Sequence, residues 1–155
     1  MMDASESPGL RAYQDGYRWD GVQYLPYKEE GSAAFRAISR QVLFSDRALA
    51  CDLRYFEIAP GGYSSLERHE HVHAVMILRG SGRCLVGERV IRVKPYDLVS
   101  VPGWTWHQFR ANGDSTLGFL CMVNQARDRP QVPSAEELAA LQANPDIAAF
   151  LAAET

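Results

Sequence analysis

Three of the four histidines lie close together, at His69, His71 and His73, and the fourth is His107, shortly after a Pro-Gly pair. Glu67 precedes the first histidine by two positions. Because strand side chains alternate between two faces, positions 67, 69, 71 and 73 would share one face of a continuous strand. Neutral imidazoles together with a carboxylate suit Mn, Fe, Ni or Zn. The spacing therefore predicts a site for a divalent metal ion.

The segment around these histidines has the pattern of an all-β domain. From position 48 to 123, short β-branched, aromatic and aliphatic runs are separated by Gly, Pro and Asp, without a helical period. Turn residues recur at 60–62, 80–82, 95–97, 102–103 and 112–114. The expected strands are 36–44, 49–58, 63–70, 73–79, 83–87, 89–93, 98–101, 106–111 and 116–123. Strands at this spacing favour a small barrel or a jelly roll.

The two ends of the chain differ from this segment. Residues 1–35 are polar with scattered aromatic residues, and we interpret them as an N-terminal extension of a barrel over 36–124. In the tail, 125–155, Ser134 and Glu137 form the pattern of a capping box, and Asn144 precedes Pro145. We expect two short helices there, over 135–142 and 145–153.

Composition narrows the class of protein. The 155 residues suffice for one globular domain, with 46% hydrophobic and 23% charged residues. The net charge of −3 argues against a nucleic-acid partner. The longest apolar runs, 117–123 and 147–153, fall well short of the about 20 residues of a membrane span. No secretory signal is visible in the first decade, so we expect a cytoplasmic protein, and cysteines outside any CxxC spacing are interpreted as reduced thiols.

Two motifs in residues 58–123 resemble those of the cupin superfamily. The first begins at Pro60-Gly61-Gly62 and ends in the hairpin Leu78-Arg79-Gly80-Ser81-Gly82, and the second runs from Asp97 to Asn112. The resemblance implies an all-β, cupin-type antiparallel β-barrel (jelly roll) with short C-terminal helices. When the ligand positions of the family motif are counted back from the hairpin, the resemblance implies that Glu67, His69 and His73 are metal ligands. The second motif adds His107.

Two features of this motif depart from the family pattern. Glu67 occupies a slot that is usually His, and His73 one that is often Glu, so the set still holds three imidazoles and one carboxylate. A rival register uses His69 and His71 as the ligand pair, which would place Val75 or Met76 in the carboxylate slot. In the favoured register, His71 is a neighbour of the ligands or a general acid or base.

The expected metal is Mn, with Fe or Ni as alternatives. Four protein ligands on an octahedral ion leave two adjacent positions for a bidentate oxygen ligand. Such an ion acts as a Lewis acid on a carbonyl and its neighbouring hydroxyl and favours an enediolate. Isomerases, dioxygenases and lyases share this beginning, so the ligand set alone leaves all three open.

Cys121 lies in the last expected strand, in the segment Phe119-Leu120-Cys121. Small metal cupins that end similarly place this cysteine inside the barrel near the metal. It is either a small core residue or a nucleophile activated by the neighbouring cation. Cys51 and Cys84 have no such motif beside them.

The segment 62–80 together with Cys121 resembles the small bacterial cupins of methylthioadenosine salvage. Those enzymes remove the methylthio group from 1-methylthioxylulose 5-phosphate, giving 1-deoxyxylulose 5-phosphate with glutathione as acceptor. The resemblance implies a metal-dependent methylthiotransferase with Cys121 as nucleophile, and Arg54, Arg68 or Arg110 as the residue that holds the sugar phosphate. The alternatives are a Mn- or Fe-dependent dioxygenase, an isomerase, and a non-catalytic small-molecule-binding cupin. The aromatic N-terminal segment also predicts a homodimer.

Overall fold

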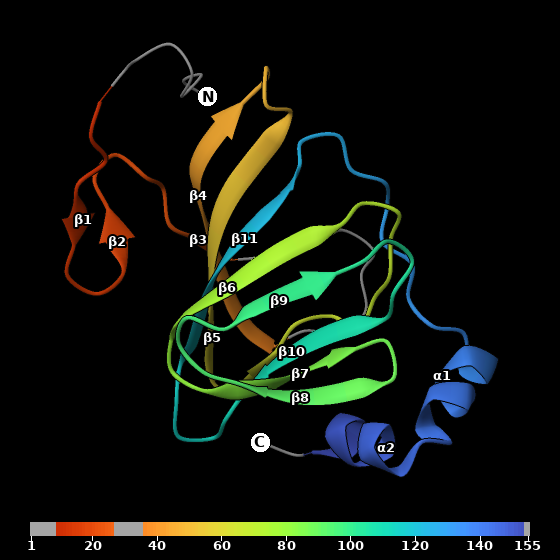
Figure 1. Cartoon of the computed structure of the whole chain (residues 1–155). Helices are drawn as coiled ribbons and strands as arrows, with labels where there is room; N and C mark the ends of the chain where they lie inside the picture. The colour runs from red at the N-terminus through yellow and green to blue at the C-terminus, as the bar shows by residue number, and fades with distance from the viewer. Residues whose placement is uncertain (1–8, 27–35, 154–155) are drawn as a thin grey trace.

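The computed structural model describes residues 9–26 and 36–153, so 1–8 and 27–35 of the expected extension lie outside the described residues. A nine-stranded antiparallel sheet curls around an interior in this part of the chain, and two short helices follow it (Figure 1). The all-β, cupin-type prediction is confirmed. The strands of this sheet are β3 (Leu25–Pro26), β4 (Arg36–Asp46), β5 (Cys51–Tyr63), β6 (His73–Arg79), β7 (Gly82–Val86), β8 (Arg89–Val93), β9 (Leu98–Val101), β10 (His107–Ala111) and β11 (Leu117–Asn124).

The long strand β5 joins the two halves of the curled sheet. Along residues 51–58 it pairs with β4 and β11, and at Tyr63 it pairs with β10. One half therefore has the order β3-β4-β5-β11-β6-β9, and the other continues from β5 through β10 and β7 to β8. Gly61 has a φ of 75°, which lets the strand bend where it passes between the halves. The turn expected at 60–62 is thus a bend within a strand.

The strand expected at 63–70 does not form beyond Tyr63. Residues 64–72 connect β5 to β6 and make isolated bridges, Glu67 with His107 and Arg68 with Gln131. Their backbone hydrogen bonds go to two different neighbours, so no single strand supports a continuous ladder. The histidines at 69 and 71 consequently lie on a loop rather than on one strand face.

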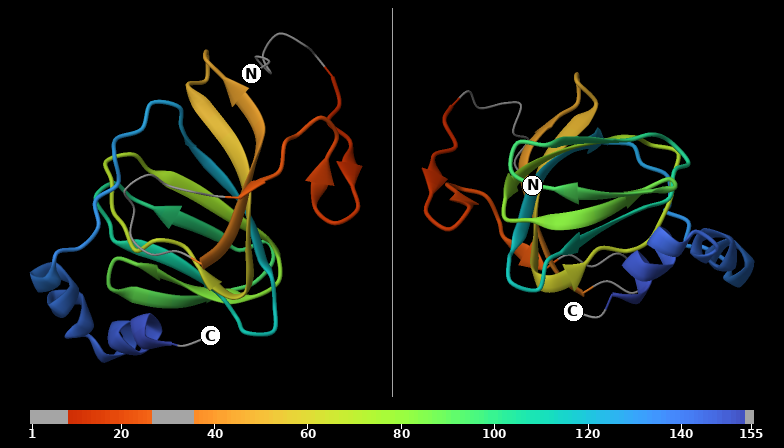
Figure 2. Two further views of the ribbon diagram at one scale, coloured as in Figure 1. Left: turned by 180° about the vertical axis from the view of Figure 1, so that it is seen from behind. Right: turned by 60° about the horizontal axis from the view of Figure 1, so that its bottom comes forward.

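The hydrophobic core lies between the two halves of the curled sheet, whose arrangement the right-hand view of Figure 2 shows. It includes Ile58, Val75, Ile77, Phe109 and Phe119. The aromatic rings of Phe109 and Phe119 stack with centroids 4.9 Å apart. Some of these core side chains, including Val75, Phe109 and Phe119, also line a cavity beside the histidines.

The C-terminal helices cover the outer face of β7 and β8. Helix α1 spans Ala135–Gln142 and α2 spans Pro145–Ala152, as expected to within one residue. Ser134 and Glu137 form the predicted capping box, and Asn144 caps α2. Ile147 and Phe150 of α2 are fully buried in a second apolar cluster with Leu66 and Leu85.

The described N-terminal residues pack on the outside of the sheet. A hairpin of β1 (Tyr13–Gln14) and β2 (Arg18–Trp19) stands beside β4 and β5 in Figure 1. Tyr17 stacks on Tyr55 with centroids 5.7 Å apart, and Trp19 meets the same ring edge-on.

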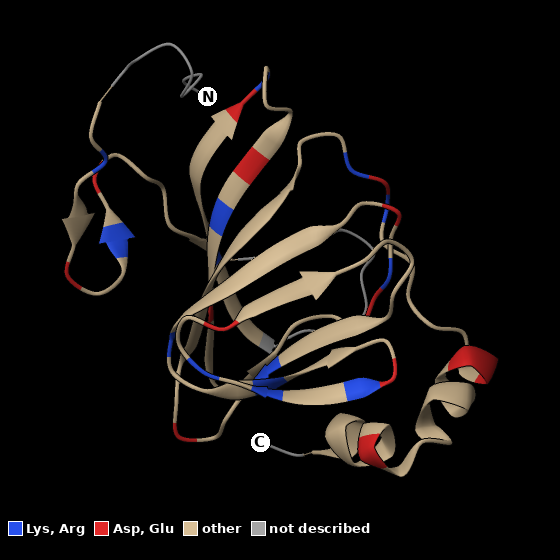
Figure 3. Cartoon of the chain, viewed as in Figure 1, with Lys and Arg blue, Asp and Glu red and all other residues tan. Residues whose placement is uncertain are grey.

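In Figure 3, basic and acidic positions are interspersed over the strands. No helix of the described residues is long and apolar enough to cross a membrane.

Candidate metal centre and active site

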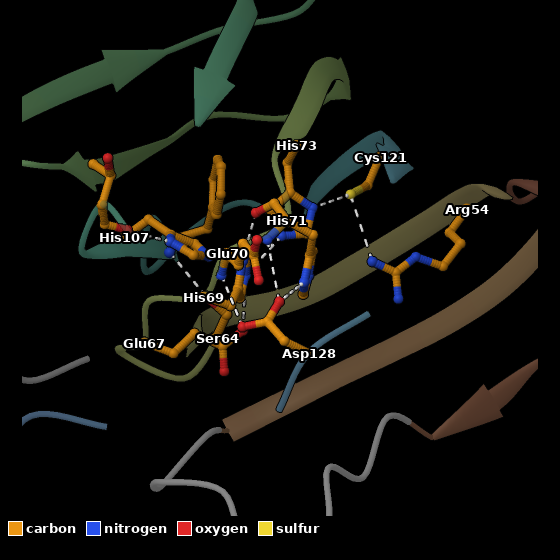
Figure 4. A network of polar contacts seen from close by, with 12 residues as sticks. Arg54, Ser64, Glu67, His69, Glu70, His71, His73, His107, Cys121 and Asp128 are labelled. Carbon is orange, nitrogen blue, oxygen red and sulfur yellow. Dashed lines mark hydrogen bonds and ion pairs between the residues drawn. The ribbon is translucent and has the colours of Figure 1, made fainter. Parts of the chain in front are cut away.

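The four histidines lie at one end of the interior, around a cavity of about 270 Å³ (Figure 4). His73 is the first residue of β6, His107 is the first of β10, and His69 and His71 belong to the loop between β5 and β6. The cavity has an apolar wall that includes Phe56, and its remaining lining is largely polar. The loop and two strand ends therefore bring together side chains that are up to 38 positions apart in the sequence.

Three of these histidines form a cluster with the geometry of a metal centre. One ring nitrogen of each of His69, His73 and His107 lies within 4.8 Å of the others. The Nδ1 of His69 is 2.8 Å from the carbonyl oxygen of His71, and the Nδ1 of His107 is 2.9 Å from that of Thr105. A carbonyl only accepts, so both Nδ1 atoms carry the hydrogen, and each Nε2 keeps its lone pair. Two neutral imidazoles are thus oriented as a metal requires.

Glu67 lies beside this cluster. Its Oε1 is 3.8 Å from the Nε2 of His69, and the Nε2 of His69 is 2.9 Å from the Nε2 of His73. Two ligands at about 2.1 Å from one octahedral ion lie about 3.0 to 4.2 Å apart, so both spacings are compatible with a shared ion. The donor set of Glu67, His69, His73 and His107 therefore fits a divalent metal.

Burial keeps two histidines of the cluster, His73 and His107, neutral. Desolvation lowers the pKa of His107 to about 4, and the hydrogen bond to Thr105 offsets part of this effect. Desolvation also lowers the pKa of His73 far below its ordinary value, and the neighbouring His107 and His69 add to the shift. Neutral imidazole is the form that binds a metal.

His71 lies against the cluster and has its own partner, Asp128. The ring of His71 stacks on that of His69 with centroids 3.6 Å apart, and its Nδ1 is 2.7 Å from Oδ1 of Asp128. Asp128 also accepts hydrogen bonds from the backbone N–H groups of Glu70 and His71. Burial raises the pKa of Asp128, but these hydrogen bonds outweigh it and hold the pKa well below its usual value. An ionised carboxylate thus orients His71.

Asp128 belongs to the site and was not predicted from the sequence. It lies in the irregular segment after β11, where neither periodicity nor a motif marks it. His69, His71 and Asp128 also form a second group with ligand atoms within 4.8 Å, which keeps part of the rival register geometrically open.

Cys121 is buried in the wall of the same cavity. Its Sγ is 3.0 Å from the Nδ1 of His73 and 3.7 Å from Nη2 of Arg54. Burial raises the pKa of the Cys121 thiol, and the Arg54 guanidinium opposes the rise. Cys84, in contrast, lies fully buried in the core, where desolvation raises its pKa to about 12. Cys121 is therefore the cysteine that combines burial with contacts to the histidine cluster and a cation.

The three arginines suggested for a phosphate separate in the structure. Arg54 lines the cavity. Arg68 forms an ion pair with Glu137 on the outside, and Arg110 donates to the carbonyl oxygens of Leu151 and Ala153 at the end of α2. Arg40 and Arg127, which the sequence analysis did not single out, also line the cavity. Arg54, Arg40 and Arg127 are consequently the arginines that line the cavity, and Arg127 pairs with Asp52 at 2.9 Å.

This combination of curled sheet and histidine centre defines a cupin. The chain belongs to the cupin family, and the family model of the cupin domain matches residues 54–123. The chain is 58% identical over 151 residues to 1-methylthio-D-xylulose 5-phosphate methylsulfurylase of Rhodospirillum rubrum, and the match covers 97% of each chain.

Solved structures agree with this relationship. A cupin-2 domain protein of Rhodospirillum rubrum is 58% identical with a TM-score of 0.83, and the match covers 92% of this chain and 95% of that one. A cupin 2 conserved barrel domain protein of Rhodopseudomonas palustris is 58% identical with a TM-score of 0.86, covering 92% and 98%. A shorter match, 37% identical over 57 residues, links 37% of this chain to 28% of 5-nitrosalicylic acid 1,2-dioxygenase of Bradyrhizobium sp.

Proposed function

We propose that this protein removes the methylthio group from 1-methylthio-D-xylulose 5-phosphate and releases 1-deoxyxylulose 5-phosphate. The observation that carries the proposal is the position of the Cys121 sulfur, 3.0 Å from a histidine of the candidate metal centre and in the same cavity. The near full-length relative named as a methylsulfurylase of that substrate supports the same reaction. The cavity provides a nucleophile, a proton donor and cations.

Glu67, His69, His73 and His107 are the proposed ligands of a divalent cation, with Mn expected before Fe or Ni. When bound, the cation supplies Lewis-acid stabilisation of a ketose carbonyl and its neighbouring hydroxyl. The carboxylate favours a harder ion than an all-histidine set would, and cellular availability contributes to the choice.

The sulfur chemistry falls to Cys121. Its thiolate attacks the sulfur of the methylthio group, so an S–S bond forms while the bond from that sulfur to C1 breaks. The electron pair of the broken bond passes into the adjacent C2 carbonyl, so the ketose is left as the enolate across C1 and C2, and C1 then takes up a proton. We assign the proton to His71, because Asp128 holds its Nδ1 and leaves the other ring nitrogen to exchange hydrogen.

A second thiol completes the cycle. Cys121 now carries a methyl disulfide, and the thiolate of glutathione attacks the methylthio sulfur, releasing Cys121 and forming the mixed disulfide of glutathione and methanethiol. A thiol acceptor fits the reducing cytoplasm expected from the sequence. Because Arg54 lies beside the reacting sulfur, we assign the phosphate at the other end of the substrate to the other two arginines of the cavity lining, Arg40 and Arg127, although Arg127 also pairs with Asp52.

Cys121→Ser tests this function. The variant is expected to fold and to bind metal but to lose turnover, because a hydroxyl is a poor nucleophile toward sulfur. Without the second thiol, the parent enzyme should gain the mass of one methylthio group less a hydrogen, and Cys51→Ser and Cys84→Ser should behave like the parent. An active Cys121→Ser enzyme would refute thiolate attack, and oxygen uptake would indicate a dioxygenase instead.

We also infer that the protein is a homodimer. The aromatic residues Tyr17 and Trp19 cover Tyr55 of their own chain. The outer face of β6 and β9, however, exposes Met76 and the paired Leu98. A second copy is the proposed cover for this face, and a monomer in light scattering would contradict it.

A further inference from the structure

The three histidines of the proposed metal centre differ in what holds their Nδ1 atoms. The Nδ1 of His69 faces the backbone carbonyl oxygen of His71, and the Nδ1 of His107 faces that of Thr105. For His73 the partner is the sulfur of Cys121, at 3.0 Å. Two of the proposed ligands are thus oriented by backbone carbonyl groups, which take no part in the proposed reaction. The third is oriented by the thiol of the proposed nucleophile.

The register of the strands produces this contact. Val123 of β11 pairs with His73, and Cys121 pairs with Val75, so Cys121 and His73 are diagonal neighbours on the inner face. The other ring nitrogen of His73, Nε2, faces the histidine cluster and lies 2.9 Å from the Nε2 of His69. The imidazole of His73 therefore connects the cluster at one nitrogen to the sulfur at the other (Figure 4).

We propose that Cys121 is also the positioning residue for His73, so that the affinity for metal depends on its side chain. An imidazole that binds a metal through Nε2 carries its hydrogen on Nδ1, and the Cys121 sulfur lies where it accepts that hydrogen. The partner fixes both the tautomer and the orientation of the ring. This inference rests on the proposed metal centre and adds a second task to the proposed nucleophile.

Removal of the sulfur tests the inference through metal binding rather than turnover. In Cys121→Ala the Nδ1 of His73 loses its acceptor, and the affinity for Mn²⁺ measured by calorimetry should fall about 10- to 100-fold. Cys121→Ser, which keeps an acceptor, should recover most of that loss. Cys84→Ala removes a sulfur that is equally buried but does not line the cavity, and it should bind Mn²⁺ like the parent.

A second variant separates the loss of the acceptor from a loss of packing. Cys121→Val fills the volume without providing an acceptor, so its Mn²⁺ affinity should fall as in Cys121→Ala, while thermal unfolding of the metal-free variants shows that each is folded. Parent-like affinity in both variants would overturn the positioning role.

Metal affinity and turnover test the two proposed roles of Cys121 independently. Lost turnover with parent-like Mn²⁺ affinity would leave Cys121 a nucleophile only. Weakened affinity with full turnover at saturating Mn²⁺ would support the positioning role and refute the nucleophile.

Discussion

Replacement of Arg54 by methionine should affect stability and activity in opposite directions. Arg54 is 6% exposed, and its contacts are the Cys121 sulfur and the ring of Phe56, with Cζ 4.9 Å from the centroid. Its Nε is buried without a hydrogen-bond partner, and no carboxylate of the described residues forms an ion pair with it. A guanidinium in this setting contributes little to the stability of the fold and is placed to interact with a ligand or a reacting atom.

The magnitudes follow from these contacts. The ring contact contributes about 0.5 to 2 kcal/mol and a hydrogen bond to sulfur about 1 kcal/mol, whereas removing a guanidinium from water costs several kcal/mol. The free energy of unfolding of Arg54→Met should therefore stay level or rise by about 1 to 2 kcal/mol. Turnover should fall about 10- to 150-fold, because a charged partner of the reacting sulfur contributes about 1.5 to 3 kcal/mol.

Arg110→Met is the matched control. Arg110 is 7% exposed, but it donates to two carbonyl oxygens at the end of α2 and lies outside the cavity. Its loss should lower the free energy of unfolding by about 2 to 4 kcal/mol and leave kcat within about twofold. Thermal unfolding and steady-state kinetics measure both effects. The reasoning is refuted if Arg54→Met unfolds like Arg110→Met, or if it keeps its kcat.

Three further substitutions test other parts of the structure. Asp128→Asn should lower kcat about 10- to 100-fold with unchanged metal content, because it removes the charge that orients the proposed proton donor; parent-like kinetics would contradict that role. Glu67→Gln should weaken Mn²⁺ binding in calorimetry at least about tenfold, and unchanged affinity would remove Glu67 from the ligand set. Gly80→Ala should lower the free energy of unfolding by more than about 2 kcal/mol, because φ is 73° and a Cβ would meet the Thr116 carbonyl oxygen. Gly113→Ala, with no atom within 4 Å of the added carbon, should unfold like the parent.

Much of the fold could be predicted because its signals are local. Alternating apolar residues and turn residues locate most strands to within a few positions, and Ser134 and Asn144 mark the helix starts. The prediction of a strand over 63–70 was wrong beyond Tyr63, because the alternation of histidines and acids in this segment resembles that of a strand. What decides its conformation is the pairing available to its backbone, and that depends on distant segments around His107 and Gln131.

The candidate site was predictable where one motif carries several of its residues. The cupin-like spacing led to Glu67, His69, His73 and His107, and the structure brings these side chains together, although their role as ligands stays a prediction. Asp128 and Arg127 could not be found in this way. They belong to an irregular segment after β11, and they enter the cavity lining through contacts with residues distant in the sequence, Asp128 with His71 and Arg127 with Asp52.

The position of Cys121 follows from strand pairing and explains why its chemistry and the metal centre belong together. A cysteine one residue earlier or later in β11 would point to the outer face, because strand side chains alternate. Two residues earlier, Phe119 pairs across β6 with Ile77, so position 119 is not diagonal to His73, and its ring stacks on Phe56 and Phe109 in the core. Position 121 is diagonal to His73 and beside Arg54, so a sulfur there contacts a histidine of the cluster and a cation at once. A change in the bonding of this sulfur therefore reaches the histidine cluster directly, through one imidazole ring.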